Sequence, residues 1–187
     1  MTNDKTKNKP KWYQGGQWKE LEQGDLLPAC PILTPPENLS QILATAEAGK
    51  SVEIQSSIGY ANLIVTTQTC DLQNEGKGET VLLCAYTDAS KYTRNQQIDV
   101  SKGKRVAQYM LDRCDLSGLK FEHQIVDFRA VYSLPIPFVL EFAKNLGRRV
   151  RVRSPYKENF SKAFGDYFSR VALPRNISEL PKEVVPK

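Results

Sequence analysis

Histidine is almost absent from this sequence, and cysteine occurs only at scattered positions. The single histidine is His123, and none of the four cysteines belongs to a CxxC pair. These residues do not form the closely spaced cysteine and histidine sets that bind zinc. We therefore expect no metal site and no cofactor, and we expect the thiols to be reduced, as in the cytoplasm.

The sequence also lacks a glycine-rich phosphate loop and any long hydrophobic run. Its longest apolar runs, residues 61–67 and 81–86, have the length of strands, whereas a helix that spans a bilayer needs about 20 apolar residues. Residues 1–11 are polar and rich in lysine, unlike the apolar centre of a secretory signal. These absences predict a soluble, cytoplasmic protein that makes no contact with a membrane.

The length of 187 residues suits one domain. We predict a disordered tail over residues 1–11, a single domain over 12–175 and a flexible tail over 176–187. The runs 60–67 and 80–87 are apolar enough for central strands. Further strands are expected near 26–27, 52–54, 125–134 and 149–153, helices at 38–48, 104–114 and 156–171, a short turn or helix at 138–145, and irregular chain over 88–101.

Positive charge is concentrated near the end of the chain. The stretch 144–175 has nine basic residues against two acidic ones, a net charge of +7, which leaves −2 for the rest of a chain whose total is +5. Such an asymmetry indicates the kind of partner a protein binds rather than its fold. It predicts an anionic partner, which is RNA, DNA or an acidic protein.

The arginines within this stretch alternate with valines. On a strand, alternate residues share a face, so Arg149, Arg151 and Arg153 are expected on one side. Arginine forms planar, bidentate contacts with phosphate and carboxylate groups. We therefore take Arg148, Arg149, Arg151, Arg153 and Lys157 as candidate residues for binding nucleic acid or a partner. A network of salt bridges is the alternative interpretation.

A second candidate site follows the predicted strand that ends near residue 67. Residues 66–71 combine hydroxyl, amide, thiol and carboxylate groups at the start of a loop, where functional side chains are often found. Cys70 could act as a nucleophile beside Asp71, or Asp71 could close a turn over a packed Cys70. Because the only histidine lies far along the chain, the turn is the preferred interpretation.

Three segments in order resemble the MazF/PemK-like toxins, which are small SH3-like barrels. Gly24-Asp25-Leu26 is similar to that family's opening strand, residues 61–66 to its second core strand and residues 81–87 to its third. The resemblance covers about half the chain. It implies an α+β fold: a strongly bent SH3-like barrel or sheet of five or six strands, with inserted helices and a C-terminal amphipathic helix.

The resemblance also implies a function, because members of that family are usually metal-independent endoribonucleases, often dimeric, that act in bacterial toxin–antitoxin, stress and defence systems. Thr87 fits the family's residue at the end of the third strand, and Thr87 with Asp71 are the candidate catalytic residues. The family's arginine before the second strand is missing, since Gly59 and Tyr60 stand there. We therefore expect a non-catalytic binding module, with a divergent endoribonuclease that uses an arginine from 148–153 as the alternative.

Overall fold

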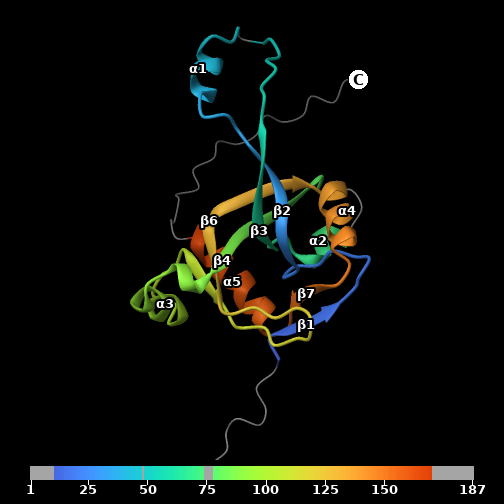
Figure 1. The fold of residues 1–187 in the computed structure, drawn as a ribbon, viewed down its shortest axis with the longest axis vertical. Coiled ribbons are helices and arrows are strands. Elements are labelled where there is room, and N and C mark those ends of the chain that lie inside the picture. Colours follow the sequence, from blue (N-terminus) through green and yellow to red (C-terminus); the bar gives the residue numbers. More distant parts are fainter. Residues whose placement is uncertain (1–10, 48, 74–77, 170–187) are drawn as a thin grey trace, which may run out of the picture.

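The computed structural model describes residues 11–47, 49–73 and 78–169 (Figure 1). The expected tails, the end of the last helix and most of the loop at 74–78 lie outside these residues. A two-stranded antiparallel sheet pairs β1 (Tyr13–Gly16) with β7 (Arg149–Val152). A five-stranded antiparallel sheet has the order β2 (Leu26–Thr34), β3 (Ser57–Val65), β4 (Thr80–Asp88), β6 (Gln124–Pro135) and β5 (Gln108–Leu111).

Helices connect these strands, and two of them, α4 and α5, pack against the larger sheet. They are α1 (Leu39–Ala44), α2 (Thr69–Gln73), the 3₁₀ turn η1 (Ala89–Lys91), α3 (Arg94–Ser101), α4 (Ile136–Leu146) and α5 (Tyr156–Phe168). The predicted α+β class is confirmed, and the five-stranded sheet is bent but does not close into a barrel. Register shifts after Leu27 and after Cys84 interrupt two of its ladders, and such bulges bend a strand.

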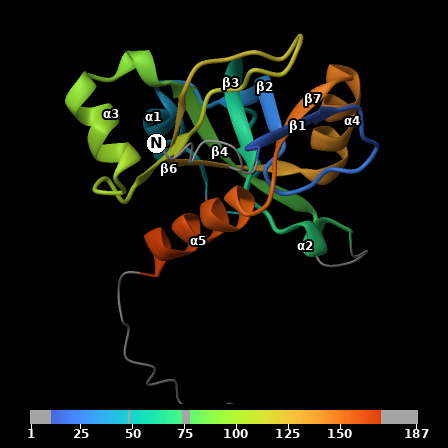
Figure 2. The same cartoon turned by 90° about the horizontal axis from the view of Figure 1, so that it is seen from below.

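Each face of the larger sheet carries its own hydrophobic core. On one face, Phe128 and Phe160 are fully buried between β6 and α5 (Figure 2). On the other face, Val81 and Leu83 of β4 pack with Val139 of α4. Residues 83–86 of β4 alternate between the two cores, and this explains why the middle of the strand is apolar on both faces. The prediction of two central strands is confirmed, although parts of both are exposed.

Several local predictions are wrong, among them that of a short strand near 26–27, since β2 continues to Thr34. Residues 108–111 form β5 rather than a helix, because they pair with β6 and complete the sheet. Residues 94–101 form α3, which begins at a capping box between Thr93 and Gln96. The region around Val52 and Ile54 is neither a strand nor half-buried, since both side chains are exposed.

One part of the chain projects from the body of the molecule. The strands β2 and β3 continue beyond the sheet as a two-stranded ribbon and carry α1 near its end (Figure 1). We call residues 33–60 the arm. Its helix is shorter than predicted and buries none of its residues. None of the arm's described residues is buried.

Candidate functional site

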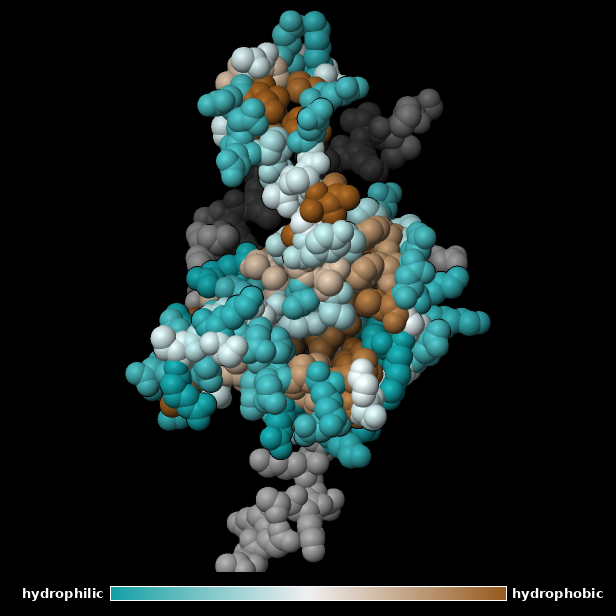
Figure 3. All heavy atoms as spheres, in the orientation of Figure 1, coloured by the Kyte–Doolittle hydropathy of each residue, from teal (hydrophilic) through white to brown (hydrophobic). Residues whose placement is uncertain are grey.

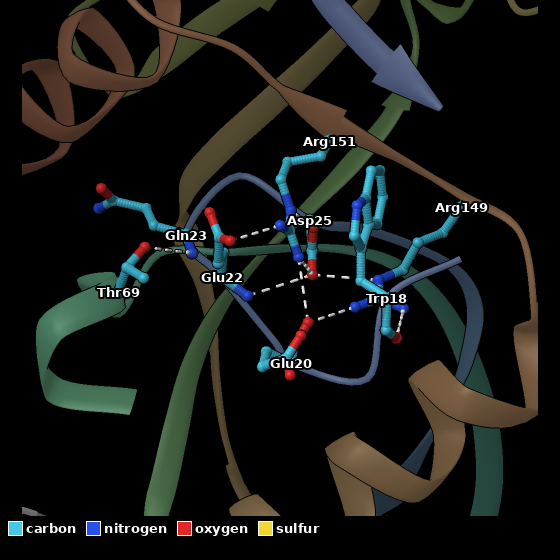
Figure 4. Close-up of polar contacts among 8 residues, drawn as sticks. All are labelled: Trp18, Glu20, Glu22, Gln23, Asp25, Thr69, Arg149 and Arg151. Atoms are coloured by element: carbon cyan, nitrogen blue, oxygen red, sulfur yellow. Dashed lines mark hydrogen bonds and ion pairs between the residues drawn. The ribbon is translucent and has the colours of Figure 1, made fainter. Parts of the chain in front are cut away.

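A buried ion-pair cluster joins the start of β2 to β7 (Figure 4). Asp25 is fully buried and accepts hydrogen bonds from the guanidinium groups of Arg149, at 3.0 Å, and of Arg151, at 2.9 Å. Arg151 also forms an ion pair of 2.6 Å with Glu22. Both arginines are almost fully buried, with 2% and 3% exposure.

Backbone carbonyl groups and an aromatic ring complete the cluster. Arg149 donates to the carbonyl oxygens of Trp18 and Glu20, and Arg151 donates to that of Glu20. The Trp18 ring lies 4.3 Å from the Arg151 guanidinium carbon and 5.4 Å from that of Arg149, within the range of cation–π attraction. Two positive charges face two carboxylates, so the cluster is electrically balanced.

This arrangement corrects the predicted binding surface. Arg149 and Arg151 do lie on one face of a strand, but that face points into the protein, where Asp25 occupies their donors. Neither arginine is available to a phosphate backbone. Arg153 is exposed before α5, and Lys157 lines a different hollow beside Cys70. Of the five predicted binding residues, Arg148 alone has an exposed side chain at the cavity described next.

That cavity, the basic pocket, has a volume of about 420 Å³. Its walls include apolar side chains from β2, β7 and the segment before β6, namely Leu26, Val150, Leu119 and Phe121. Three exposed cations surround it: Lys91 from η1, Lys120 from the segment before β6, and Arg148 from the residue that precedes β7. Asp88 is the one carboxylate among its lining residues. The pocket therefore combines apolar walls with an excess of positive charge, which suits an anionic ligand that has an apolar part.

Local contacts hold the groups of the basic pocket in place. Arg148 donates through Nη1 to the carbonyl oxygen of Ser117, at 2.9 Å, which fixes its guanidinium over the chain that carries Lys120. Asp88 accepts a hydrogen bond of 2.7 Å from the backbone N–H of Ser90, and hydrogen bonds from Ser90 lower the pKa of Asp88. Burial raises the pKa of Tyr86. At neutral pH the pocket thus has a charged Asp88 and an uncharged Tyr86 phenol.

The two predicted catalytic residues lie at opposite ends of β4. Thr87 lines the basic pocket, whereas Asp71 lies in α2, close to the start of β4, where Thr67 accepts a hydrogen bond from the Leu82 N–H. Five residues of strand, about 16 Å, separate Leu82 from Thr87. The structure therefore brings Thr87 together with Arg148 and does not bring it together with Asp71.

The Cys70 segment forms the short helix α2 rather than an open turn. Cys70 is exposed, and its thiol lies 3.7 Å from the Gln68 side-chain oxygen and 3.8 Å from that of Asp71. His123 lines another cavity, where its Nε2 lies 3.1 Å from a carboxylate oxygen of Asp112. The thiol and the imidazole do not share a cavity, so this geometry does not support the Cys–His pair that cysteine catalysis uses.

The hollow that contains His123 is the larger one, about 960 Å³. It lies between α3, β5 and α5, and its lining includes the stacked rings of Trp12 and Tyr156, whose centroids are 3.9 Å apart. Its ionisable groups are of both signs, with Arg94 and His123 beside Asp112 and Asp166. Such a lining selects no particular ligand charge, which is why the basic pocket is the better candidate.

Comparison with known proteins adds no relative: the sequence matches no protein-family model and shows no significant similarity to a curated protein. Within residues 11–47, 49–73 and 78–169, no group of three or more histidine, cysteine or acidic residues could hold a metal ion. None of the helices in the same ranges is long and apolar enough to cross a bilayer.

Proposed function

We propose that this protein is a nucleic-acid-binding module, and that the basic pocket holds a nucleotide of a single strand. The observation that carries the proposal is the convergence of Lys91, Lys120 and Arg148 on one cavity with apolar walls. Cations at a phosphate supply most of the affinity in nucleic-acid complexes, and an apolar wall can cover the face of a base. The pocket's volume, about 420 Å³, suits a single nucleotide better than a duplex.

The resemblance of three strands to MazF/PemK-like toxins supports RNA as the ligand and a role in a bacterial stress or defence system. It also gives a second candidate function, a divergent endoribonuclease. One observation favours that candidate: Arg148, just before β7, lines the same cavity as Thr87, so it could serve in place of the arginine that the family has where Gly59 and Tyr60 stand. A cation beside the scissile phosphate would stabilise the charge that develops in the transition state.

A salt titration tests nucleic-acid binding. Fluorescence anisotropy with a short single-stranded RNA, and separately with duplex DNA, should show affinity that falls as salt rises. Replacing Lys120 and Arg148 together with glutamine removes two phosphate contacts. For a single strand, the slope of log K against log salt should become shallower by about 1.4, at about 0.7 per contact. Lys104→Gln, which removes an exposed cation that does not line the basic pocket, should leave the slope unchanged.

The same samples test cleavage. Discrete RNA fragments that disappear in Thr87→Ala and in Arg148→Gln would favour the endoribonuclease, and intact RNA after long incubation would exclude it. Absence of binding even at low salt would reject the nucleic-acid proposal and leave an acidic protein as the partner. Binding that the double glutamine variant retains in full would place the ligand elsewhere on the surface.

A further inference from the structure

The arm exposes an apolar face on its two-stranded part. In the register of β2 and β3, Leu33 lies opposite Ile58 and Pro31 lies opposite Tyr60. Residues two apart on a strand share a face, so these four side chains form one surface, which we call the ribbon face. Leu33 is 73% exposed, Ile58 64% and Tyr60 71%. Three large apolar side chains therefore stand together in water.

The reverse side of the ribbon differs in character. There Thr34 lies opposite Ser57, and Ile32 lies opposite Gly59. Thr34 and Ser57 are small and polar, and Ile32 is partly covered by the core on the α4 side of the sheet. The apolar exposure is thus confined to one side of the ribbon, which is the pattern of a face that another surface covers.

Apolar side chains are concentrated in the arm as a whole. Among the described residues, six of the eleven exposed large hydrophobic side chains belong to the arm, although it is a small part of the chain. Figure 3 shows apolar atoms at the surface both near the end of the arm and where the arm meets the body. Because contiguous exposed apolar surface is uncommon on monomers, this concentration indicates an interface.

Charge indicates what that interface contacts. The arm has three acidic residues, Glu37, Glu47 and Glu53, against one lysine, Lys50, a net charge of −2, whereas the other described residues have a net charge of +3. A negative arm repels nucleic acid and attracts a positive protein surface. The body of a second copy of this chain is such a surface.

The edge of the sheet limits how a second copy can dock. β2 is an outer strand, but Pro28 and Pro31 lack the N–H groups that an added strand would need. Docking therefore uses the face of the ribbon rather than its edge. If two ribbon faces pack in opposite directions about a two-fold axis, the acidic end of each arm approaches the basic body of the other copy.

We propose that the protein forms a homodimer in which the ribbon faces of two copies pack against each other, with Leu33 and Ile58 at the centre. The apolar face supplies the buried surface, and the opposite charges of arm and body set the orientation. The ribbon face and the basic pocket are separate surfaces. The dimer proposal can therefore fail while nucleic-acid binding is confirmed, and nucleic-acid binding can fail while the dimer is confirmed.

Analytical ultracentrifugation of the full chain over a roughly hundredfold range of concentration tests the proposal, because a dimer gains population as protomer concentration rises. We expect the wild type to reach a dimer. Leu33→Glu and Ile58→Glu should each raise the dimer dissociation constant by about tenfold or more, since each places a charge in the apolar contact. Thr34→Glu, on the reverse side of the same ribbon, is the matched control and should dimerise like the wild type.

Circular dichroism checks that the variants fold, which is expected because the substituted side chains are largely exposed. A wild type that stays monomeric at every concentration overturns the proposal and assigns the ribbon face to another protein. A dimer that survives Leu33→Glu and Ile58→Glu, or that Thr34→Glu disrupts equally, also overturns it. RNA binding by the Leu33→Glu and Ile58→Glu variants is measured separately by anisotropy. This measurement tests the basic-pocket proposal independently of whether the protein dimerises.

Discussion

Replacing Asp25 with asparagine is expected to destabilise the protein by about 3–5 kcal/mol. The change removes the carboxylate that both Arg149 and Arg151 contact and leaves two guanidinium groups in a site that excludes water. Carbonyl oxygens of Trp18 and Glu20 still accept hydrogen bonds from these groups, but they carry no compensating charge. A urea titration should show a lower midpoint with little change in slope.

Glu22→Gln is the control for this experiment. Its carboxylate also contacts Arg151, but the Glu22 side chain is 28% exposed, and Arg151 keeps its contact with the buried carboxylate of Asp25. We expect a loss of about 1 kcal/mol or less. Equal losses for the two variants would contradict the view that burial of the charges, rather than the number of ion pairs, determines the effect.

The same cluster shows what an alternating pattern can and cannot predict. The sequence correctly indicated that Arg149 and Arg151 share a face of a strand. It could not indicate which face of the strand points into the protein. All four residues of β7 are buried, so the strand has no exposed face to which the charged residues would belong. What turns the arginines inward is Asp25, which lies 124 positions before Arg149. A pattern read within one segment contains no information about a partner so distant.

Elements that depend on strong local signals were predictable. The aromatic periodicity of α5 and the apolar runs of β3 and β4 identified these elements close to their observed bounds. β5 was not predictable, because its four residues are a strand only by virtue of their pairing with β6. α3 could have been found, since a threonine followed three residues later by glutamine is a helix start signal.

The candidate site contains some residues that the sequence indicated and others that only the folded chain brings together. Thr87 became a candidate through the resemblance to the MazF/PemK-like toxins, and Arg148 through the cluster of basic residues. Their presence in one cavity depends on how β7 and the segment before β6 fold beside β4. Lys91 and Lys120 were missed because each is a single lysine in an irregular stretch, and only the folded chain gathers them. Counting charges overstated the exposed basic surface, because the count included Arg149 and Arg151, which are buried against Asp25.

The second large effect is expected for Phe128→Ala, at about 3–5 kcal/mol. Phe128 is fully buried, and its ring contacts three aromatic rings of α5: the centroids lie 5.9 Å from Phe160, 5.6 Å from Phe164 and 5.9 Å from Tyr167. Truncation removes the apolar surface that binds α5 to the sheet and leaves a cavity that neighbouring rings cannot fill. The midpoint of urea unfolding measures the loss.

Phe168→Ala provides the comparison within the same helix. Phe168 also touches two rings, Phe164 and Tyr167, but it is 59% exposed, so its removal creates no enclosed cavity. A loss of about 1 kcal/mol or less is expected. If the two variants unfold at the same urea concentration, the aromatic contacts of Phe128 cannot be what binds α5 to the sheet. A much lower midpoint for Phe128→Ala alone means that stability here depends on the filling of an enclosed space rather than on the number of ring contacts.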